Sequence, residues 1–223
     1  MTKTITLTLA VLALGIGLFS SAVEAAGGSS APPPTNPVDT AAASYERGLS
    51  ARDKAWALEK EALNANPSQR EKLTAKTQKQ YEKAARAFRS AIEENPQMYR
   101  AHSSLGYTLR KTGNYEESLS AYNKALEINP GYVEAIEYRA EAFLGLDRLD
   151  EAKEAYMQLF RDDRERAEEL MTAMKAWVED HQEESGSLDT GTVQEFTDWV
   201  NERAEVAGHT ASLSSSASSW PSD

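Results

Sequence analysis

Apolar residues recur every three or four positions along most of the chain, the spacing that places them on one side of an α-helix. The clearest stretch, residues 99–130, reads as two amphipathic helices joined by Gly113-Asn114. Asparagine-proline pairs at residues 66–67 and 95–96 end the preceding helices, and Pro67 suits the first position of the next one. The pattern therefore predicts an all-α fold.

The helical pattern repeats with a period of 34 residues. Agreement at many small, aromatic and proline positions indicates an internal repeat. The positions that this shift superposes are Tyr81, Tyr115 and Leu149; Ala84, Ser118 and Ala152; Phe88, Tyr122 and Tyr156; Ala91, Ala125 and Leu159; and Pro96 and Pro130.

The repeat resembles the tetratricopeptide repeat (TPR), a helical hairpin with a small residue and an aromatic residue at set positions. In the central copy the motif positions hold Gly106, Ser118, Tyr122, Ala125 and Pro130. The resemblance covers residues 41–162 and implies a right-handed superhelix of about three TPR-like hairpins with C-terminal capping helices. It also implies an interaction scaffold rather than an enzyme.

These signals divide the chain into five parts. We expect a signal peptide at 1–25, a Pro/Gly/Ser-rich linker at 26–40, repeats at 41–162, capping helices at 163–207 and a Ser-rich disordered tail at 208–223. The repeats would comprise an extended first hairpin (41–98), a second (99–132) and a third (133–162). A capping box at 192–195 would open the last helix, and Gly208 would end it.

The first hairpin departs from the motif. Gly48, the expected small residue, precedes Ala84 by 36 positions, where the motif has about 12. Residues 70–80 contain no helix breaker, so longer helices are favoured over a disordered loop. Tyr45, Leu49 and Trp56 would then be among its packing residues.

The start of the chain has the layout of a secretory signal peptide. Lys3 precedes an apolar run at 5–19 and small residues that favour cleavage after Ala25. An uncleaved anchor is the alternative, but the run would reach only about 22 Å of a roughly 30 Å hydrocarbon core. We therefore expect a periplasmic or secreted mature chain without a transmembrane anchor.

Composition excludes several classes of function. The net charge of −11 argues against nucleic-acid binding, which needs a basic surface. The chain has no cysteine, and its three histidines are scattered without a metal-binding or catalytic motif. We expect no catalytic residue, no metal site and no cofactor; His102 reads as a packing residue.

Charge is unevenly distributed. Residues 161–223 hold fifteen acids and five bases, whereas 1–160 hold twenty and nineteen. One helix carries a row of cations, called here the basic stripe: Lys72, Lys76, Lys79, Lys83 and Arg86. The stripe is either a solvated face or a docking strip for an anionic lipid, polymer or acidic protein, as in an envelope-assembly or accessory subunit. Head-to-tail pairing with the acidic end of a second copy is also open, which allows a homo-oligomer.

The resemblance also implies a partner-binding groove lined by the first helix of each hairpin. In the central repeat these positions are Arg100, Ser103, Tyr107, Arg110 and Lys111, and in the third they are Glu134, Glu137, Glu141 and Leu144. One wall would be basic and the next acidic. The Lys and Asn of carboxylate-clamping relatives are not reproduced, since Tyr45 and Leu49 stand in the first copy. We expect a protein or peptide segment of mixed charge, anchored near Tyr107 and Leu144; simple solvation of these side chains is the alternative.

Overall fold

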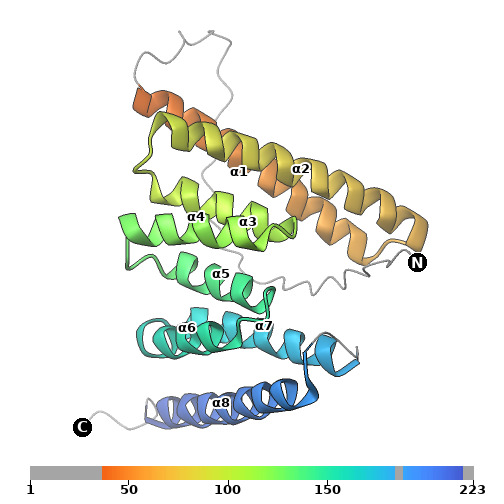
Figure 1. Ribbon diagram of the computed structural model, residues 1–223, viewed down its shortest axis with the longest axis vertical. Coiled ribbons are helices and arrows are strands. Elements are labelled where there is room, and N and C mark those ends of the chain that lie inside the picture. Colours follow the sequence, from red (N-terminus) through yellow and green to blue (C-terminus); the bar gives the residue numbers. More distant parts are fainter. Residues whose placement is uncertain (1–36, 184–187, 218–223) are drawn as a thin grey trace. The chain divides into compact units, whose positions relative to one another are not determined.

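The computed structural model describes residues 37–183 and 188–217, and all regular structure within these ranges is α-helical (Figure 1). The predicted all-α class is confirmed. The helices are α1 (Pro37–Leu63), α2 (Pro67–Glu94), α3 (Tyr99–Lys111), α4 (Tyr115–Ile128), α5 (Val133–Leu144), α6 (Leu149–Asp162), α7 (Arg164–Glu183) and α8 (Thr190–Ala217). They fall into two compact units, one with α1–α5 and the other with α6–α8.

The first hairpin is built from two long helices. α1 has 27 residues and α2 has 28, so the extra residues lengthen the helices, and the connection is short. Pro67 is the first residue of α2, and Asn66 and Gln69 cap it reciprocally: each side chain accepts a hydrogen bond from the other's backbone N–H. Gly48 faces the Phe88 ring so closely that a Cβ atom there would lie 2.3 Å from it. This contact fixes the register of α1 on α2.

The second hairpin, α3 and α4, follows the same rule. A Cβ atom on Gly106 would lie 2.7 Å from the ring of Tyr122, which is completely buried. The turn between the helices uses Gly113 at a φ of 78°, a conformation that glycine adopts without strain. Within this unit α3 packs on α2, and α5 packs on α3 and α4.

The second unit holds an aromatic core. Tyr156 of α6 and Trp177 of α7 meet α8, the first through Trp199 at 5.5 Å between ring centroids and the second through Phe196 at 5.0 Å. Edge-to-face pairs of this kind add to the apolar burial. None of the helices in the described ranges is long and apolar enough to cross a membrane.

Three helix ends differ from the sequence predictions. α1 begins at Pro37, within the expected linker, because proline lacks the N–H that a first helical residue leaves unpaired. α8 is opened by Asp189, which accepts a hydrogen bond from the Thr192 backbone N–H at 3.0 Å, so the cap lies three residues before the expected one. α8 also continues through Gly208 to Ala217, since an interior glycine weakens a helix by only about 1 kcal/mol. The predicted signal peptide at 1–25 lies outside the described residues.

Candidate functional site

Five side chains of α3 were expected to line the groove, and the structure separates them by exposure. Arg100 is exposed, whereas Tyr107, Arg110 and Lys111 are half-buried. Ser103 is buried, with 4% of its surface accessible. Ser103 therefore supports packing rather than contact with a partner.

Tyr107 lies at the centre of four aromatic rings contributed by four helices. We call Trp56, Tyr81, Tyr107 and Tyr138 the aromatic face. The Tyr107 ring centroid lies 5.8 Å from that of Trp56, 6.2 Å from Tyr81 and 5.3 Å from Tyr138, each in an edge-on arrangement. The indole N–H of Trp56 donates a hydrogen bond to the Tyr107 hydroxyl oxygen at 2.7 Å.

Trp56 is the most accessible member of the aromatic face. Its side chain is 39% exposed, although the sequence placed it among the packing residues of the first hairpin. The guanidinium of Arg52 covers the ring at 4.1 Å from its centroid. The Trp56 indole is thus held by Arg52 on its own helix and by Tyr107 on α3, with part of its apolar surface open to solvent.

The predicted basic and acidic walls neutralise each other. Nη1 of Arg110 on α3 lies 2.5 Å from a carboxylate oxygen of Glu141 on α5, and both side chains are mostly buried. The guanidinium also lies within 6 Å of the Tyr107 and Tyr138 ring centroids. Burial is the largest single effect and lowers the pKa of Arg110, but Glu141, Tyr122 and Tyr107 together outweigh it, so the pKa of Arg110 is raised above its ordinary value.

Lys111 is paired in the same way. Its ammonium lies 2.9 Å from Glu59 on α1 and above the ring of Tyr81. Burial raises the pKa of the Tyr81 hydroxyl, and nearby Tyr107 and Glu59 raise it further. Two of the predicted groove cations, Arg110 and Lys111, thus form ion pairs with carboxylates of the same unit, because opposite charges on neighbouring helices pair where the helices pack.

The α5 residues were predicted to form the acidic wall, but two of the four are inaccessible. Glu137 and Leu144 are buried, with 3% and 4% of their surface exposed. Leu144 is therefore not an anchor point for a partner. Glu134 accepts a hydrogen bond from the Tyr132 hydroxyl, and Glu141 is held by Arg110.

The first-repeat positions Tyr45 and Leu49 are packing residues. The Tyr45 ring lies 5.6 Å from that of Phe88, and its hydroxyl lies 3.5 Å from Ser104 Oγ. Both Tyr45 and Leu49 pack against the core cluster that includes Phe88 and Leu105. They offer no cation for a terminal carboxylate.

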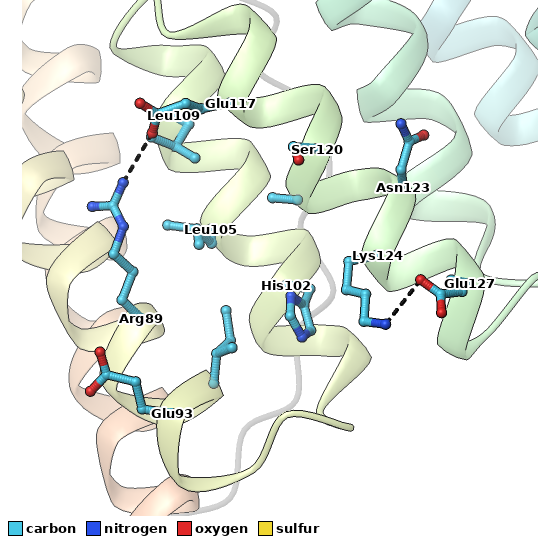
Figure 2. Close-up of a pocket in the computed structure, with 12 residues that line it drawn as sticks. Arg89, Glu93, His102, Leu105, Leu109, Glu117, Ser120, Asn123, Lys124 and Glu127 are labelled. Carbon is cyan, nitrogen blue, oxygen red and sulfur yellow. Dashed lines mark hydrogen bonds and ion pairs between the residues drawn. The ribbon is translucent and has the colours of Figure 1, made fainter.

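A cleft that the sequence did not predict lies between α2 and α4, with α3 as its floor (Figure 2). It has a volume of about 700 Å³ and an apolar floor that includes Leu105 and Leu109. Its charged rim includes Glu93 and two ion pairs: Arg89 meets Glu117 at 3.2 Å across the cleft, and Lys124 meets Glu127 at 2.9 Å. The cleft therefore carries charges of both signs, and its apolar floor is part of the hydrophobic core.

His102 also lines this cleft, and its surroundings fit the packing role that the sequence indicated. Its Nε2–H donates a hydrogen bond to the Pro96 carbonyl oxygen at 2.9 Å, since a carbonyl oxygen can only accept. The side chain is almost fully buried. His102 thereby ties the start of α3 to the chain that leads into it.

The basic stripe forms a continuous exposed row on α2. All five cations lie on the side opposite the buried residues, which include Leu73, Tyr81 and Phe88. No ion pair links any stripe residue to a carboxylate within the described part of the chain. The stripe therefore differs from the groove cations, whose charges are compensated.

Two family profiles, each described as Tetratricopeptide repeat, match residues 73–133 and 109–177. The matches overlap on α4 and carry the small-against-aromatic contact of Gly106 with Tyr122 in the expected register. The chain is a tetratricopeptide repeat protein. TPR proteins are in general interaction scaffolds rather than enzymes, and this fold supports a protein-protein interaction scaffold here.

Several solved TPR structures are similar to this chain. The first TPR of Spaghetti (RPAP3), bound to the HSP90 peptide SRMEEVD, is 20% identical, with 56% of this chain and 94% of that chain covered and a TM-score of 0.41. The TPR2B domain of yeast Sti1, in a complex with pHsp70, is 16% identical, with coverage of 71% and 98% and a TM-score of 0.35. A TPR protein from Parabacteroides merdae is 20% identical, with coverage of 81% and 78% and a TM-score of 0.39.

Proposed function

We propose that this TPR protein is an exported scaffold that binds a segment of a partner protein on the aromatic face. The observation that carries the proposal is the hydrogen bond between Trp56 and Tyr107. It holds a partly exposed indole ring in one orientation before any partner arrives. A preorganised aromatic surface loses little conformational entropy on binding, and such rings supply much of the energy of protein interfaces.

The chemistry of the aromatic face indicates what the partner segment carries. An apolar or aromatic side chain fits the open side of Trp56, since it would replace water on the indole. Arg110 and Lys111 are already paired with Glu141 and Glu59. The partner therefore needs no net charge to match them, and binding by an apolar anchor should depend only weakly on salt.

Arg100 has a different role in this proposal. It is exposed at the start of α3, beside Tyr99, with its guanidinium 5.8 Å from that ring centroid. A peripheral cation of this kind mainly affects how fast a partner associates, rather than how tightly it is held. Replacement of Arg100 by Glu should slow association with an acidic partner at low salt and change dissociation little.

Export rests on the first 25 residues, which have the layout of a cleavable signal. We propose a periplasmic or extracellular location for the mature chain. The intact mass of protein recovered from the exported fraction should correspond to a chain that starts at Ala26. A mass that includes Met1 would contradict cleavage.

Photo-crosslinking in the producing cell tests the proposed binding face. A photoreactive amino acid at Lys60, exposed one turn along α1 from Trp56, leaves the indole in place and should capture a discrete partner segment. The matched control is the same group at Lys54, which is exposed on the other side of α1. Equal capture from both positions, or capture from Lys54 alone, would place the binding surface elsewhere.

A further inference from the structure

The exposed side of α8 carries a row of acids, called here the acidic stripe: Glu195, Asp198, Glu202 and Glu205. Their spacing of three, four and three residues places them within about a quarter of the helix circumference. Phe196 and Val200 occupy the opposite, buried side. The row extends over about 15 Å of helix.

The acidic stripe matches the basic stripe of α2 in width and spacing. The basic stripe has intervals of four, three, four and three residues and also covers about a quarter of its helix, over about 21 Å. Both rows lie opposite the buried side of their helix. Two exposed helix faces of opposite sign and the same periodicity are complementary surfaces.

We propose that the basic stripe on α2 of one copy binds the acidic stripe on α8 of a second copy. The contact uses two different surfaces, so it is heterologous, and each copy that joins leaves one stripe free at either end. Association therefore extends head to tail into chains, or closes into a ring where the rotation permits. This inference is independent of the aromatic face, which lies on other surfaces.

Few contacts within one copy compete with this pairing. Glu195 lies 3.6 Å from Lys153, and Glu202 lies 2.5 Å from Arg203. Asp198 accepts a hydrogen bond from Gln194 at 2.8 Å. Glu195 and Glu202 remain 81% and 63% exposed, and ion pairs at such sites contribute little. The acids are therefore available to a second set of cations.

The observations favour a second copy over an anionic membrane. The basic stripe is one helix face wide, and Glu71 and Glu82 lie exposed along its flank. A flat anionic surface would also meet the net charge of −11. Membrane-surface helices combine cations with large apolar side chains that insert into the lipid, whereas the exposed positions that flank the row here are Glu71, Ala75 and Glu82.

Sedimentation analysis of the mature full chain tests the proposal. At low salt the weight-average mass should rise with protein concentration, and at high salt it should return to that of a monomer, because exposed charge pairs are screened. Replacement of Lys76, Lys79 and Lys83 by Gln should abolish self-association. Replacement of Glu195 and Glu202 by Gln together with Asp198 by Asn should do the same.

The decisive experiment mixes the two disabled chains, one with the three lysines replaced and one with the three acids replaced. Each retains the stripe that the other lacks, so an equimolar mixture should form a 1:1 dimer that does not grow further. Two control triples keep the net charge of the disabled chains and should self-associate like the parent: Lys54, Lys60 and Lys175 to Gln, and Glu165, Glu168 and Glu179 to Gln.

Several results would overturn the proposal. They are a monomer at every concentration in low salt, a mixture that stays monomeric, or control triples that lose association as the stripe variants do. A salt-dependent change of shape without a change of mass would instead place the pairing within one copy. Binding of phosphatidylglycerol vesicles that requires the lysines, without self-association, would identify lipid as the ligand of α2.

Discussion

The Trp56 indole N–H donates to the Tyr107 hydroxyl at 2.7 Å, so the middle of α1 is tied directly to α3. The two rings meet edge to face at 83°, which leaves part of the indole open to solvent. A side chain that would otherwise choose among several rotamers is thereby fixed at the surface. This fixed ring, rather than a contrast between basic and acidic walls, distinguishes the candidate binding face.

The ion pair between Arg110 and Glu141 should contribute to stability. Both side chains are less than a quarter exposed, so removal of one leaves the other charge poorly solvated. A double-mutant cycle with Arg110→Ala and Glu141→Ala, followed by chemical denaturation, should give a coupling energy of about 1–3 kcal/mol. The same cycle on the exposed pair Lys124 and Glu127 is the control and should give a smaller value. Additive effects at Arg110 and Glu141 would show that the pair is not coupled.

Gly106 should not tolerate a side chain. Replacement by Ala places a Cβ atom 2.7 Å from the buried Tyr122 ring, which must shift, and overpacking of this kind costs about 1–3 kcal/mol. Gly208→Ala is the matched control, because nothing lies within 4 Å of the added atom. That change should leave the chain equally stable or stabilise it by up to about 1 kcal/mol. Denaturation followed by circular dichroism measures both, and equal effects would argue against the packing of α3 on α4.

Four of the nine tyrosines should resist ionisation while the protein is folded. Burial raises the pKa of Tyr81, Tyr122, Tyr132 and Tyr156 above the ordinary value near 10. The folded state then retains protons that the unfolded state releases, so these groups leave stability unchanged below about pH 10 and reduce it as pH rises further. Absorbance at 295 nm should therefore show a second phase that coincides with loss of helix. Full ionisation in one phase near pH 10, with helical content intact, would contradict these buried environments.

The repeat hairpins could be predicted because their rules are local. The small residues Gly48 and Gly106 face the aromatic residues Phe88 and Tyr122, as the motif requires, even though the first hairpin has much longer helices. The absence of a helix breaker in residues 70–80 was enough to favour those longer helices. Position within the motif thus determines which side chains meet across a hairpin.

The candidate site could be predicted only in part. The resemblance to the TPR motif placed Arg110 and Glu141 on the walls of one groove, but it could not show that two long side chains would pair with each other rather than with a ligand. Trp56 was missed as a surface residue because a large apolar side chain is usually buried, although the residues three and four positions away, Arg52, Asp53, Glu59 and Lys60, are all charged. Side-chain pairing and exposure between helices are tertiary properties, which the sequence pattern does not encode position by position.

The affinity of the captured partner segment for Trp56→Ala tests the central claim most directly. Trp56 is preferred to Tyr107 for this purpose, because Tyr107 contacts three other rings and its loss would disturb packing. By isothermal titration calorimetry, with helical content checked by circular dichroism, Trp56→Ala should weaken binding by about 1–3 kcal/mol, roughly 5- to 150-fold. Lys54→Ala, on the other side of α1, should bind like the parent. Unchanged affinity of a folded Trp56→Ala variant would contradict the account, because the aromatic face would then not be the binding site.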